Sequence, residues 1–566
     1  MLGPAPVMNV LILVGAIVAA ALAVNVSSTA YRSERRRREF GGLRRLGDGH
    51  RGFLVLLASS ITIAVPVLVA VQRADAGAGR RTAVVGGPGV LQWTITLAIL
   101  LVVGGVVAIR LSGRRGKERP EPDAMAAPAR TTPTDWRSHA VVAAILVVVA
   151  GTTAVVAART ASTTLLLYWT VGAGVVAACL ISFAVGRRFD HLPVSPGRVL
   201  CIVPVYNEPA ESLARTVHAL MAQTVPVDVI VIDDGSRTPV VPTTAHERLR
   251  WWRQPNTGKR GAQVSVLRQI PRDSYEFILT VDSDSEPYPD ACEHLLRAMS
   301  NPKVQAATGM LYIRNYRQSF VALASDIDIG SSCVMMRASR SMLGALETTS
   351  GALALYRSEL FYDHLDAYAV ECGTGDDRWL ALRALQRGEV VAVAEARVQT
   401  DMPLTVAGTY RQRLRWARSW WWMLPYVFRN LGVRQILSPV YGLTQLIVAP
   451  VVVAYATAAL TGLTPTSTDR GAERLLVLYI GAYLAVRYGL AALYLMGRPN
   501  MSPRVKVALL LAGTPLAILL NFALLTPTRY IALTRLFDNR WQTRQIDPNG
   551  LATAMALRVQ ARGVGR

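Results

Sequence analysis

Paired carboxylates follow two apolar runs in the central part of this sequence. The first pair is Asp233 and Asp234, and the second is Asp282 and Asp284. Both runs have the pattern of buried strands, and in an open α/β sheet ligands bind beyond the carboxyl ends of the strands. We therefore expect the two pairs to face one crevice. Carboxylate oxygens are ligands that Mg²⁺ and Mn²⁺ prefer, so the pattern indicates cation-assisted chemistry on a phosphorylated ligand.

The second pair is the candidate metal site. Asp282 and Asp284 are separated by one residue, which puts both carboxylates on the same side of an extended loop. A nucleotide sugar carries a diphosphate that must be neutralised as it leaves, and a carboxylate-bound Mn²⁺ or Mg²⁺ is the usual means. We assign Asp284 to the metal, and Asp282 to the metal shell or the ribose. An acidic surface turn is the alternative for this triplet taken alone.

Side chains near the first pair suit the other parts of a nucleotide donor. Asp233 and Asp234 can accept a hydrogen bond from the N–H of a uracil, while Tyr206 and Glu208 close an earlier apolar run where the base could pack. Lys259 and Arg260 lie in a polar loop and could contact the diphosphate. The alternatives are an Asx-type turn for the aspartates and a solvated loop for the lysine.

Asp376 and Asp377 form the third carboxylate cluster and are the candidates for proton transfer. A positioned carboxylate that removes the proton of an attacking hydroxyl contributes about 10²–10⁴-fold to the rate. We assign this role of general base to Asp377. Asp376 would raise the pKa of Asp377, because like charges disfavour ionisation, and Arg378 would oppose that rise. The alternative is that the two aspartates cap the start of a helix.

A basic and aromatic segment supplies the last candidates. Gln412, Arg415 and Trp416 are neighbours at i, i+3 and i+4 on an expected helix over 410–428. Arg415 can bind phosphate, and the indole of Trp416 offers a flat face to an acceptor sugar. A helix that lies at a membrane surface is the alternative for this mixture of arginines and tryptophans.

The elements that must position these residues alternate between strand and helix patterns. Strands separated by helices predict an α/β domain with a largely parallel sheet. We expect strands at 199–205, 227–232, 277–281, 304–311 and 352–356, and helices at 211–223, 259–268 and directly after Gly375.

Long apolar runs flank this domain on both sides. Hydrophobic residues make up 51% of the chain, and several runs reach the roughly 20 residues that a membrane helix needs. The first run lacks a basic start and a cleavage site, so it is expected to be a retained membrane helix. Residues 505–537, which contain Pro515 and Pro527, are too long for one simple crossing and short for two. The other expected crossings are 8–25, 53–71, 90–109, 139–157 and 163–185 before the domain, and 437–460 and 475–496 after it.

The formal net charge of +23 is concentrated in the loops between the apolar runs. The arginine-rich loop at 32–38 is cytoplasmic by the positive-inside rule, and five crossings then place the central domain in the cytoplasm. No nucleic-acid-binding module is visible in the sequence. We therefore expect the basic charge to reflect the cytoplasmic loops of a protein in the lipid bilayer rather than binding to a nucleic acid. The five cysteines show neither zinc-site nor disulfide spacing.

These patterns predict a multi-pass α-helical protein of the plasma membrane with a cytoplasmic α/β domain and amphipathic interface helices. The interface helices carry the basic and aromatic segment, so they are expected to connect the site with the membrane. The predicted parts are a transmembrane region at 1–189 with about five helices and a flexible linker near 118–135, the cytoplasmic domain at 190–403, interface helices at 404–434, a second transmembrane region at 435–537 and a basic cytoplasmic tail at 538–566.

Taken together, the motifs resemble the processive family 2 glycosyltransferases, which include the hyaluronan, cellulose, chitin and poly-N-acetylglucosamine synthases. The resemblance covers about residues 198–430. It implies a Rossmann-like GT-A fold, an inverting single displacement, and extrusion of the polymer through the chain's own membrane helices. The motifs stand in the family's order at 203–208, 233–236, 282–284, 375–377 and 412–416.

The resemblance also implies roles for the matching positions. Trp379 departs from the family, where a small or polar residue is common, and five N-terminal helices exceed the usual number. The implied roles are Asp233, Asp234 and Lys259 for uridine and diphosphate, Asp284 for the metal, Asp377 for the base, Gln412, Arg415 and Trp416 for the donor lid and acceptor platform, and Ser350 and Gly351 for the lining of the acceptor site.

The resemblance therefore predicts an enzyme that polymerises sugar from a UDP-sugar donor onto a growing β-linked polysaccharide and moves the polymer across the membrane. UDP-N-acetylglucosamine is the first expected donor, because residues 375–378 and 415–419 look most similar to hyaluronan synthase and the nodulation chitooligosaccharide synthase. UDP-glucuronate and UDP-glucose come next. The alternatives are a cellulose-type glucan synthase, a transferase of single sugars to a lipid carrier, and a catalytically silent polysaccharide exporter or scaffold. The sequence identifies no partner protein.

Overall fold

The computed structural model describes residues 136–159, residues 189–432 except 243, and residues 470–536 except 500, with isolated positions in 173–180 and 435–446. All of the candidate site residues fall within these ranges. The expected crossings at 8–25, 53–71 and 90–109, most of those at 163–185 and 437–460, the linker near 118–135 and the tail at 538–566 lie outside the described residues.

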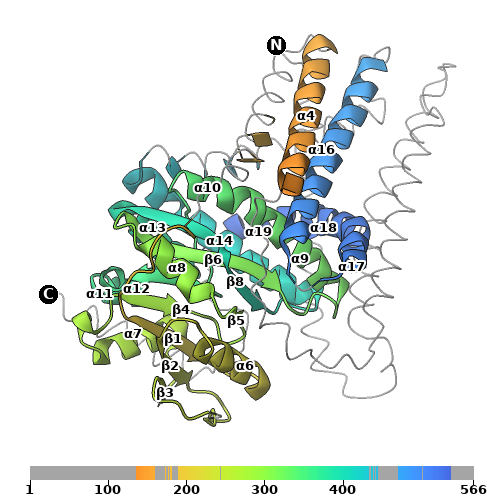
Figure 1. The fold of residues 1–566 in the computed structure, drawn as a ribbon. Helices are drawn as coiled ribbons and strands as arrows, with labels where there is room; N and C mark the ends of the chain where they lie inside the picture. The colour runs from red at the N-terminus through yellow and green to blue at the C-terminus, as the bar shows by residue number, and fades with distance from the viewer. Residues whose placement is uncertain are drawn as a thin grey trace, which may run out of the picture.

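An eight-stranded mixed sheet forms the centre of the molecule, in the order β3-β2-β1-β4-β7-β6-β8-β5 (Figure 1). The four strands at one side, β3, β2, β1 and β4, run parallel, and so do β6 and β8. The strands are β1 Val199–Val205, β2 Val227–Asp234, β3 Leu249–Gln254, β4 Phe277–Thr280, β5 Glu286–Pro287, β6 Val304–Ile313, β7 Ala354–Arg357 and β8 Glu389–Thr400.

β7 is where the expectation of a parallel sheet is wrong. It pairs antiparallel with both β4 and β6, and the short β5 pairs antiparallel with β8. The chain enters β7 from the edge at which β1, β2 and β4 end. The alternation of strand and helix patterns gives no information on the direction of a strand. As a consequence, residues 347–353, which lead into β7, lie at the same edge as the carboxylates that follow β2 and β4.

Helices cover both faces of the sheet, because its central strands are apolar on both sides. Along β1, Val199, Cys201 and Val203 pack with α6 and α8, whereas Leu200 and Ile202 pack with α7 and α11 to α13. Each helix expected in the domain is present. The helix bounds are α6 Ala210–Met221, α7 Gly258–Gln269, α8 Ala291–Met299, α9 Phe320–Ser332, α10 Ala338–Met342, α11 Ser358–Tyr362, α12 Leu365–Glu371 and α13 Asp376–Arg387, with a 3₁₀ turn at Arg272–Ser274 and a π-helical turn at Cys333–Arg337.

The helix expected over 410–428 is confirmed as α14, Val406–Asn430. Thr405 caps its start, because the Thr405 hydroxyl accepts the N–H of Gly408 at 3.1 Å. Farther along α14, Trp421 Nε1 donates to the carbonyl of Arg529 at 2.9 Å. α14 therefore joins the α/β domain to the C-terminal helices.

The apolar helices gather on one side of the α/β domain. Figure 1 shows α4, Trp136–Arg159, and α16, Arg470–Gly497, side by side and projecting away from the sheet. Within the described ranges, two helical segments are long and apolar enough to cross a membrane, Ile480–Gly497 and Pro503–Thr534. The remaining expected crossings stay predictions.

The C-terminal segment whose number of crossings the sequence leaves open forms one continuous helical stretch, Pro503–Thr534. Two π-helical turns, Leu509–Gly513 and Asn521–Leu525, interrupt it, and each precedes a helix with proline in its first turn. Proline lacks the N–H that an α-helix needs, so the wider turn lets the helix continue. The α-helical parts are α17 Pro503–Ala508, α18 Thr514–Leu520 and α19 Thr526–Thr534.

Candidate active site

The first carboxylate pair is bound by its own loops. Asp233 Oδ1 accepts the N–H of Ser236 at 2.8 Å, and Asp233 Oδ2 accepts Arg253 Nη1 at 2.9 Å. Asp234 accepts the backbone N–H groups of Thr257 at 2.9 Å and Gly258 at 2.7 Å. Both aspartates therefore accept hydrogen bonds within turns, as the alternative interpretation of this pair predicts. Contact with a uracil stays a prediction.

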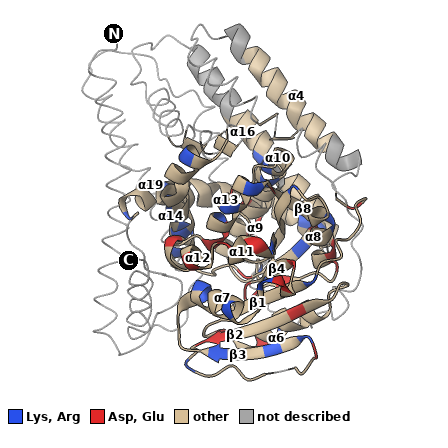
Figure 2. Ribbon diagram, turned by 90° about the vertical axis from the view of Figure 1, so that its left-hand side faces the viewer, with Lys and Arg blue, Asp and Glu red and all other residues tan. Residues whose placement is uncertain are grey.

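The bonds of Asp234 fix the start of α7, and with it Lys259. Lys259 Nζ lies 2.7 Å from Asp282 Oδ1 and 3.2 Å from Asp376 Oδ2. Burial lowers the pKa of Lys259, but the charges of Asp282, Asp376 and Asp377 outweigh burial and hold this pKa well above its usual range. One protonated amine thus joins the second and third carboxylate clusters, which are far apart in the chain. Figure 2 shows the basic residues of α7 beside the acidic residues of β2.

The candidate metal ligands lie in a tightly held loop. Asp284 Oδ1 accepts the hydroxyls of Ser285 and Thr400, each at 3.3 Å. Ser283, between the two ligands, donates to Glu208 Oε2 at 2.7 Å, so Glu208 supports this loop. Within the described ranges no three His, Cys, Asp or Glu side chains form a metal-binding group. Two carboxylates plus substrate phosphates are a usual Mg²⁺ site, so these residues fit a cation that arrives with the donor.

The loop that leads into β7 packs closely against the charged groups of the site. A Cβ atom placed on Gly351 would lie 2.9 Å from Asp282 Oδ2, 3.1 Å from Asp377 Oδ2 and 3.2 Å from Lys259 Nζ. Ser350, next to Gly351, donates its backbone N–H to Thr308 Oγ1 at 3.0 Å, which holds the loop in place. The absence of a side chain at position 351 lets three charged groups converge on the backbone of this loop.

The two adjacent aspartates of α13 differ in their electrostatics. Burial raises the pKa of Asp377 to about 7, and the neighbouring Asp376 adds to the rise. Burial also disfavours the charge on Asp376, but Lys259, Arg260 and Arg415 hold the pKa of Asp376 below its ordinary value. Two carboxyl groups whose environments separate their pKa values in this way can divide the roles of fixed charge and proton acceptor.

Tyr206 lies in a loop that is tied to the end of β2. Its neighbour Asn207 has a φ of 50°, a conformation that asparagine tolerates. Asn207 donates its backbone N–H to Ser236 Oγ at 2.9 Å, and its side-chain oxygen accepts the N–H of Arg237 at 2.9 Å. Tyr206 and Glu208 are therefore at the same edge of the sheet as the carboxylates.

α14 closes the site from the side of the apolar helices. Thr374 Oγ1 donates to the carbonyl of Arg415 at 3.4 Å, and the charge of Arg415 lowers the pKa of Asp376. A Cβ on Gly375 would lie 2.4 Å from Ser419 Cβ, so only glycine allows this close approach. Trp416 is 36% exposed, which leaves part of its indole open to a ligand. Gln412 Oε1 is buried, with no hydrogen-bond partner in the described part of the chain.

Two residues that support the site were missed from the sequence, Thr349 and Glu347. Thr349 donates its hydroxyl to the carbonyl of Asp377 at 3.1 Å. Behind Asp377, Arg378 Nη1 pairs with the buried Glu347 Oε2 at 3.4 Å. Both contacts join distant segments and leave no sequence signal. Arg260, expected at the diphosphate, helps to keep Asp376 ionised.

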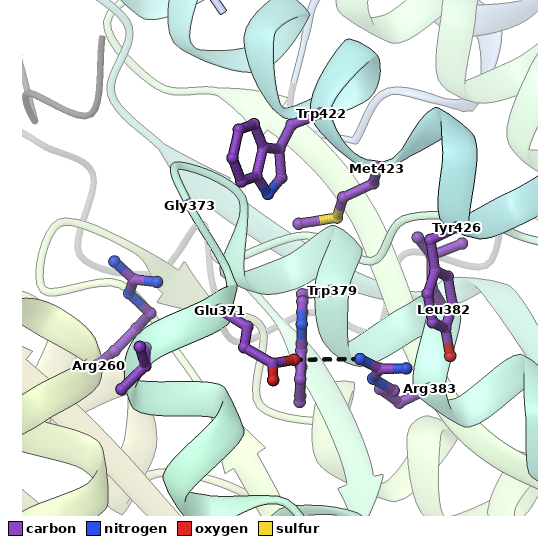
Figure 3. Close-up of a pocket in the computed structure, with 10 residues that line it drawn as sticks. Arg260, Glu371, Gly373, Trp379, Leu382, Arg383, Trp422, Met423 and Tyr426 are labelled. Carbon is purple, nitrogen blue, oxygen red and sulfur yellow. Dashed lines mark hydrogen bonds and ion pairs between the residues drawn. The ribbon is translucent and has the colours of Figure 1, made fainter. Parts of the chain in front are cut away.

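A cavity of about 340 Å³ lies behind this site, between α12, α13 and α14 (Figure 3). Its wall includes Arg260 and Trp422, and Arg383 points into it from α13. Arg383 pairs with Glu371 at 3.3 Å, and its guanidinium lies 4.7 Å from the centre of the Trp379 ring. Trp379, the residue that departs from the family pattern, is thus a buried part of the core.

Comparison with known proteins gives three related matches. Residues 196–419 match the family described as Glycosyltransferase like family 2. A hyaluronan synthase of Streptococcus pyogenes serotype M3 is 31% identical over 294 residues, which are 48% of this chain and 68% of that protein. An N-acetylglucosaminyltransferase of Sinorhizobium fredii is 31% identical over 386 residues, which are 63% of this chain and 87% of that protein.

Among solved structures, a mannosyltransferase from Pyrobaculum calidifontis in complex with GDP-mannose and Mn²⁺ is similar to this chain. The match covers 68% of this chain and 98% of the mannosyltransferase, with 19% sequence identity and a TM-score of 0.39.

Proposed function

The chain belongs to glycosyltransferase family 2, and from that premise we propose that it is a membrane-embedded, processive polysaccharide synthase with a cytoplasmic catalytic domain. Its donor is a UDP-sugar, with UDP-N-acetylglucosamine first, and its product is a β-linked polymer that passes through the membrane helices. The observation that carries the proposal is the meeting of Lys259, Asp282 and Asp377 around Gly351.

The donor is held by groups of both signs. Asp284 and Asp282 would hold Mn²⁺ or Mg²⁺, which neutralises the diphosphate when it is bound. Lys259 and Arg415 bind phosphate oxygens and stabilise the charge that grows on the departing UDP. Because Lys259 already contacts Asp282, the lysine and the cation site address the same diphosphate.

Asp377 takes the proton from the acceptor hydroxyl. The hydroxyl oxygen attacks the anomeric carbon of the donor, the bond from that carbon to the diphosphate breaks, and UDP leaves with the bonding electrons. The proton passes to Asp377, whose pKa of about 7 lets it be ionised before the step and protonated after it. This single displacement inverts the anomeric configuration.

The acceptor side of the proposal rests on α14 and the apolar helices. Trp416 presents an exposed part of its indole near the catalytic edge, and α14 runs from there to Arg529 of α19. Within the described ranges, two helical segments are long enough to span a membrane, and one of them, Pro503–Thr534, packs against α14 through α19. A polymer that leaves Trp416 would therefore meet the membrane helices directly.

The test is a donor screen with the purified full chain in lipid nanodiscs, with Mn²⁺ or Mg²⁺ present. We expect UDP release from UDP-N-acetylglucosamine and a product of many sugars that a linkage-specific glycosidase degrades. A product with one sugar on a lipid would contradict processivity. No UDP release from any UDP-sugar would contradict the proposed activity and favour the silent exporter.

A further inference from the structure

The cavity between α12, α13 and α14 has no part in the catalytic scheme above. Its volume of about 340 Å³ lies in the range of pockets that hold small molecules. Two residues of its lining, Val370 and Trp422, are each 39% exposed, and the side chain of Glu371 is 56% exposed. The cavity therefore opens to the surface, and a ligand can enter it from outside.

The walls of the cavity are largely aromatic and apolar. Figure 3 shows the Trp422 indole and the Met423 side chain on one side, and Trp379 with Glu371 on the other. An aromatic ligand can stack on an indole and contact a methionine sulfur, so walls of this kind suit a flat ring. The shape of the cavity thus selects the body of its ligand.

The charges of the lining are two arginines and one glutamate. Glu371 pairs with Arg383 at 3.3 Å, so these two charges offset each other. Arg260 is partly exposed and lies at one end of the cavity, as Figure 3 shows. Its Nη1 atom has no hydrogen-bond partner in the described part of the chain. The positive charge that the lining does not offset is therefore that of Arg260.

Arg260 connects the cavity with the catalytic edge. Its neighbour Lys259, in the same turn of α7, contacts Asp282 and Asp376, whereas Arg260 lines the cavity. Lys259, Arg260 and Arg415 together outweigh burial and hold the pKa of Asp376 below its ordinary value. A change of charge inside the cavity is therefore felt at Asp376.

We propose that this cavity is a second ligand site, which takes a small aromatic anion with its ring against Trp422 and its anionic group on Arg260, and that its occupation lowers the rate of sugar transfer. The planar guanidinium suits a phosphate or a carboxylate, which it can bind through two hydrogen bonds. The regulatory part rests on the proposed function, because the bound anion would offset the charge with which Arg260 supports Asp376.

The test measures binding of para-fluorophenyl phosphate to the full chain in phosphatidylcholine nanodiscs by fluorine NMR. UDP and Mn²⁺ are present at saturation, so that the proposed donor site is filled. The matched neutral probe is para-fluorophenol, which has the ring without the anion, and inorganic phosphate is the anion without the ring. We expect the aromatic phosphate to bind about tenfold more tightly than either, because hydrogen bonds to charged groups exceed neutral ones and the ring adds its own contacts.

Variants of the lining separate the cavity from other places where an anion could bind. Val370→Trp fills the opening and should abolish binding of the aromatic phosphate, whereas Val370→Ala, the matched control, should keep it. Arg260→Gln should remove the preference for the phosphate over the phenol. Glu371→Gln removes a negative charge and releases Arg383, so it should tighten binding. UDP affinity verifies that each variant is folded.

Activity gives a second readout of the same site. The aromatic phosphate should lower UDP release by wild type and leave the rate of Val370→Trp, which keeps wild-type basal activity, unchanged. Equal binding of all three probes, or unchanged binding in Val370→Trp, overturns the site. Binding without any effect on UDP release overturns the regulatory part. The binding measurement needs no turnover, so its failure is distinguishable from failure of the proposed activity, which the donor screen reports.

Discussion

Two buried charge clusters of this domain are built differently. At the catalytic edge, Lys259 faces three carboxylates, those of Asp282, Asp376 and Asp377. At the junction with the apolar helices, one buried aspartate, Asp326, meets one buried arginine, Arg498. The first cluster combines several carboxylates with basic side chains that include Arg260 and Arg415, and the second is a one-to-one ion pair.

The surroundings of the junction explain why it is stable without a ligand. Tyr494 donates its hydroxyl to Asp326 Oδ1 at 2.7 Å, and Arg498 Nη2 donates to the carbonyl of Ile313 at 2.6 Å. Asp326 is fully buried, so neither partner can be replaced by water. The comparison teaches that a one-to-one buried ion pair can hold elements together, whereas a cluster of several carboxylates and basic side chains can hold a charged substrate.

The largest expected effect at the catalytic edge is that of Asp377→Asn. Without the proton acceptor, kcat is expected to fall by about 10²–10⁴-fold. The measurement is UDP release at saturating donor, with UDP affinity as the check that the site still forms. A variant that keeps more than half of the wild-type kcat would contradict the role of Asp377 as the proton acceptor.

The junction is expected to respond in stability rather than in chemistry. Arg498→Met leaves Asp326 buried without its counter-charge, which costs about 3–5 kcal/mol of the free energy of unfolding. Thermal unfolding in detergent measures the loss. The double variant with Asp326→Leu removes both charges and should recover most of it. Absence of recovery would contradict the view that this pair is a balanced structural contact.

A methyl group tests the close packing at the catalytic edge. Gly351→Ala puts a carbon within 2.9–3.2 Å of Asp282, Asp377 and Lys259. We expect kcat/KM to fall by about tenfold or more, because small displacements of reacting groups are costly. Gly481→Ala is the control, since no atom of the described residues lies within 4 Å of the added carbon. Equal activities of the two variants would place the substrate elsewhere.

The smallest expected effect is a shift of the pH profile. Asp377 must be ionised to accept a proton, so with a pKa of about 7 the activity rises with pH and levels off above neutrality. Lys259 lowers the pKa of Asp377, so Lys259→Gln should move the inflection of the residual activity to higher pH. Lys303→Gln removes the same charge at an exposed position and should leave the pH profile unchanged. A shift to lower pH in Lys259→Gln would reverse the proposed electrostatics.

Local patterns predicted much of this fold. The apolar runs correctly indicated β1, β2, β4, β6 and β7, because a buried strand needs apolar residues on both faces. The direction of β7 was not predictable, since it depends on how the chain returns after α9 and α10. β3 was missed because its exposed side chains interrupt the apolar pattern.

The candidate site was predictable by residue type but not by contact. The sequence placed Asp282 and Asp377 in separate motifs, and the structure brings them to one glycine. The bridge made by Lys259 could not be foreseen, because it joins the first turn of α7 to the loop after β4 and to α13. The roles of Asp233 and Asp284 stay predictions. They call for a direct measurement of donor binding, because none of the variants above changes these residues.

The contact of Gly375 with Ser419 has a mechanical consequence. Their atoms are so close that no carbon fits between them, so α14 packs tightly against the start of α13. The start of α13 carries Asp376 and Asp377, and α14 also reaches the carbonyl of Arg529 in α19. A tilt of α19 relative to the α/β domain would therefore be transmitted through α14 to Asp377, the residue proposed as the proton acceptor.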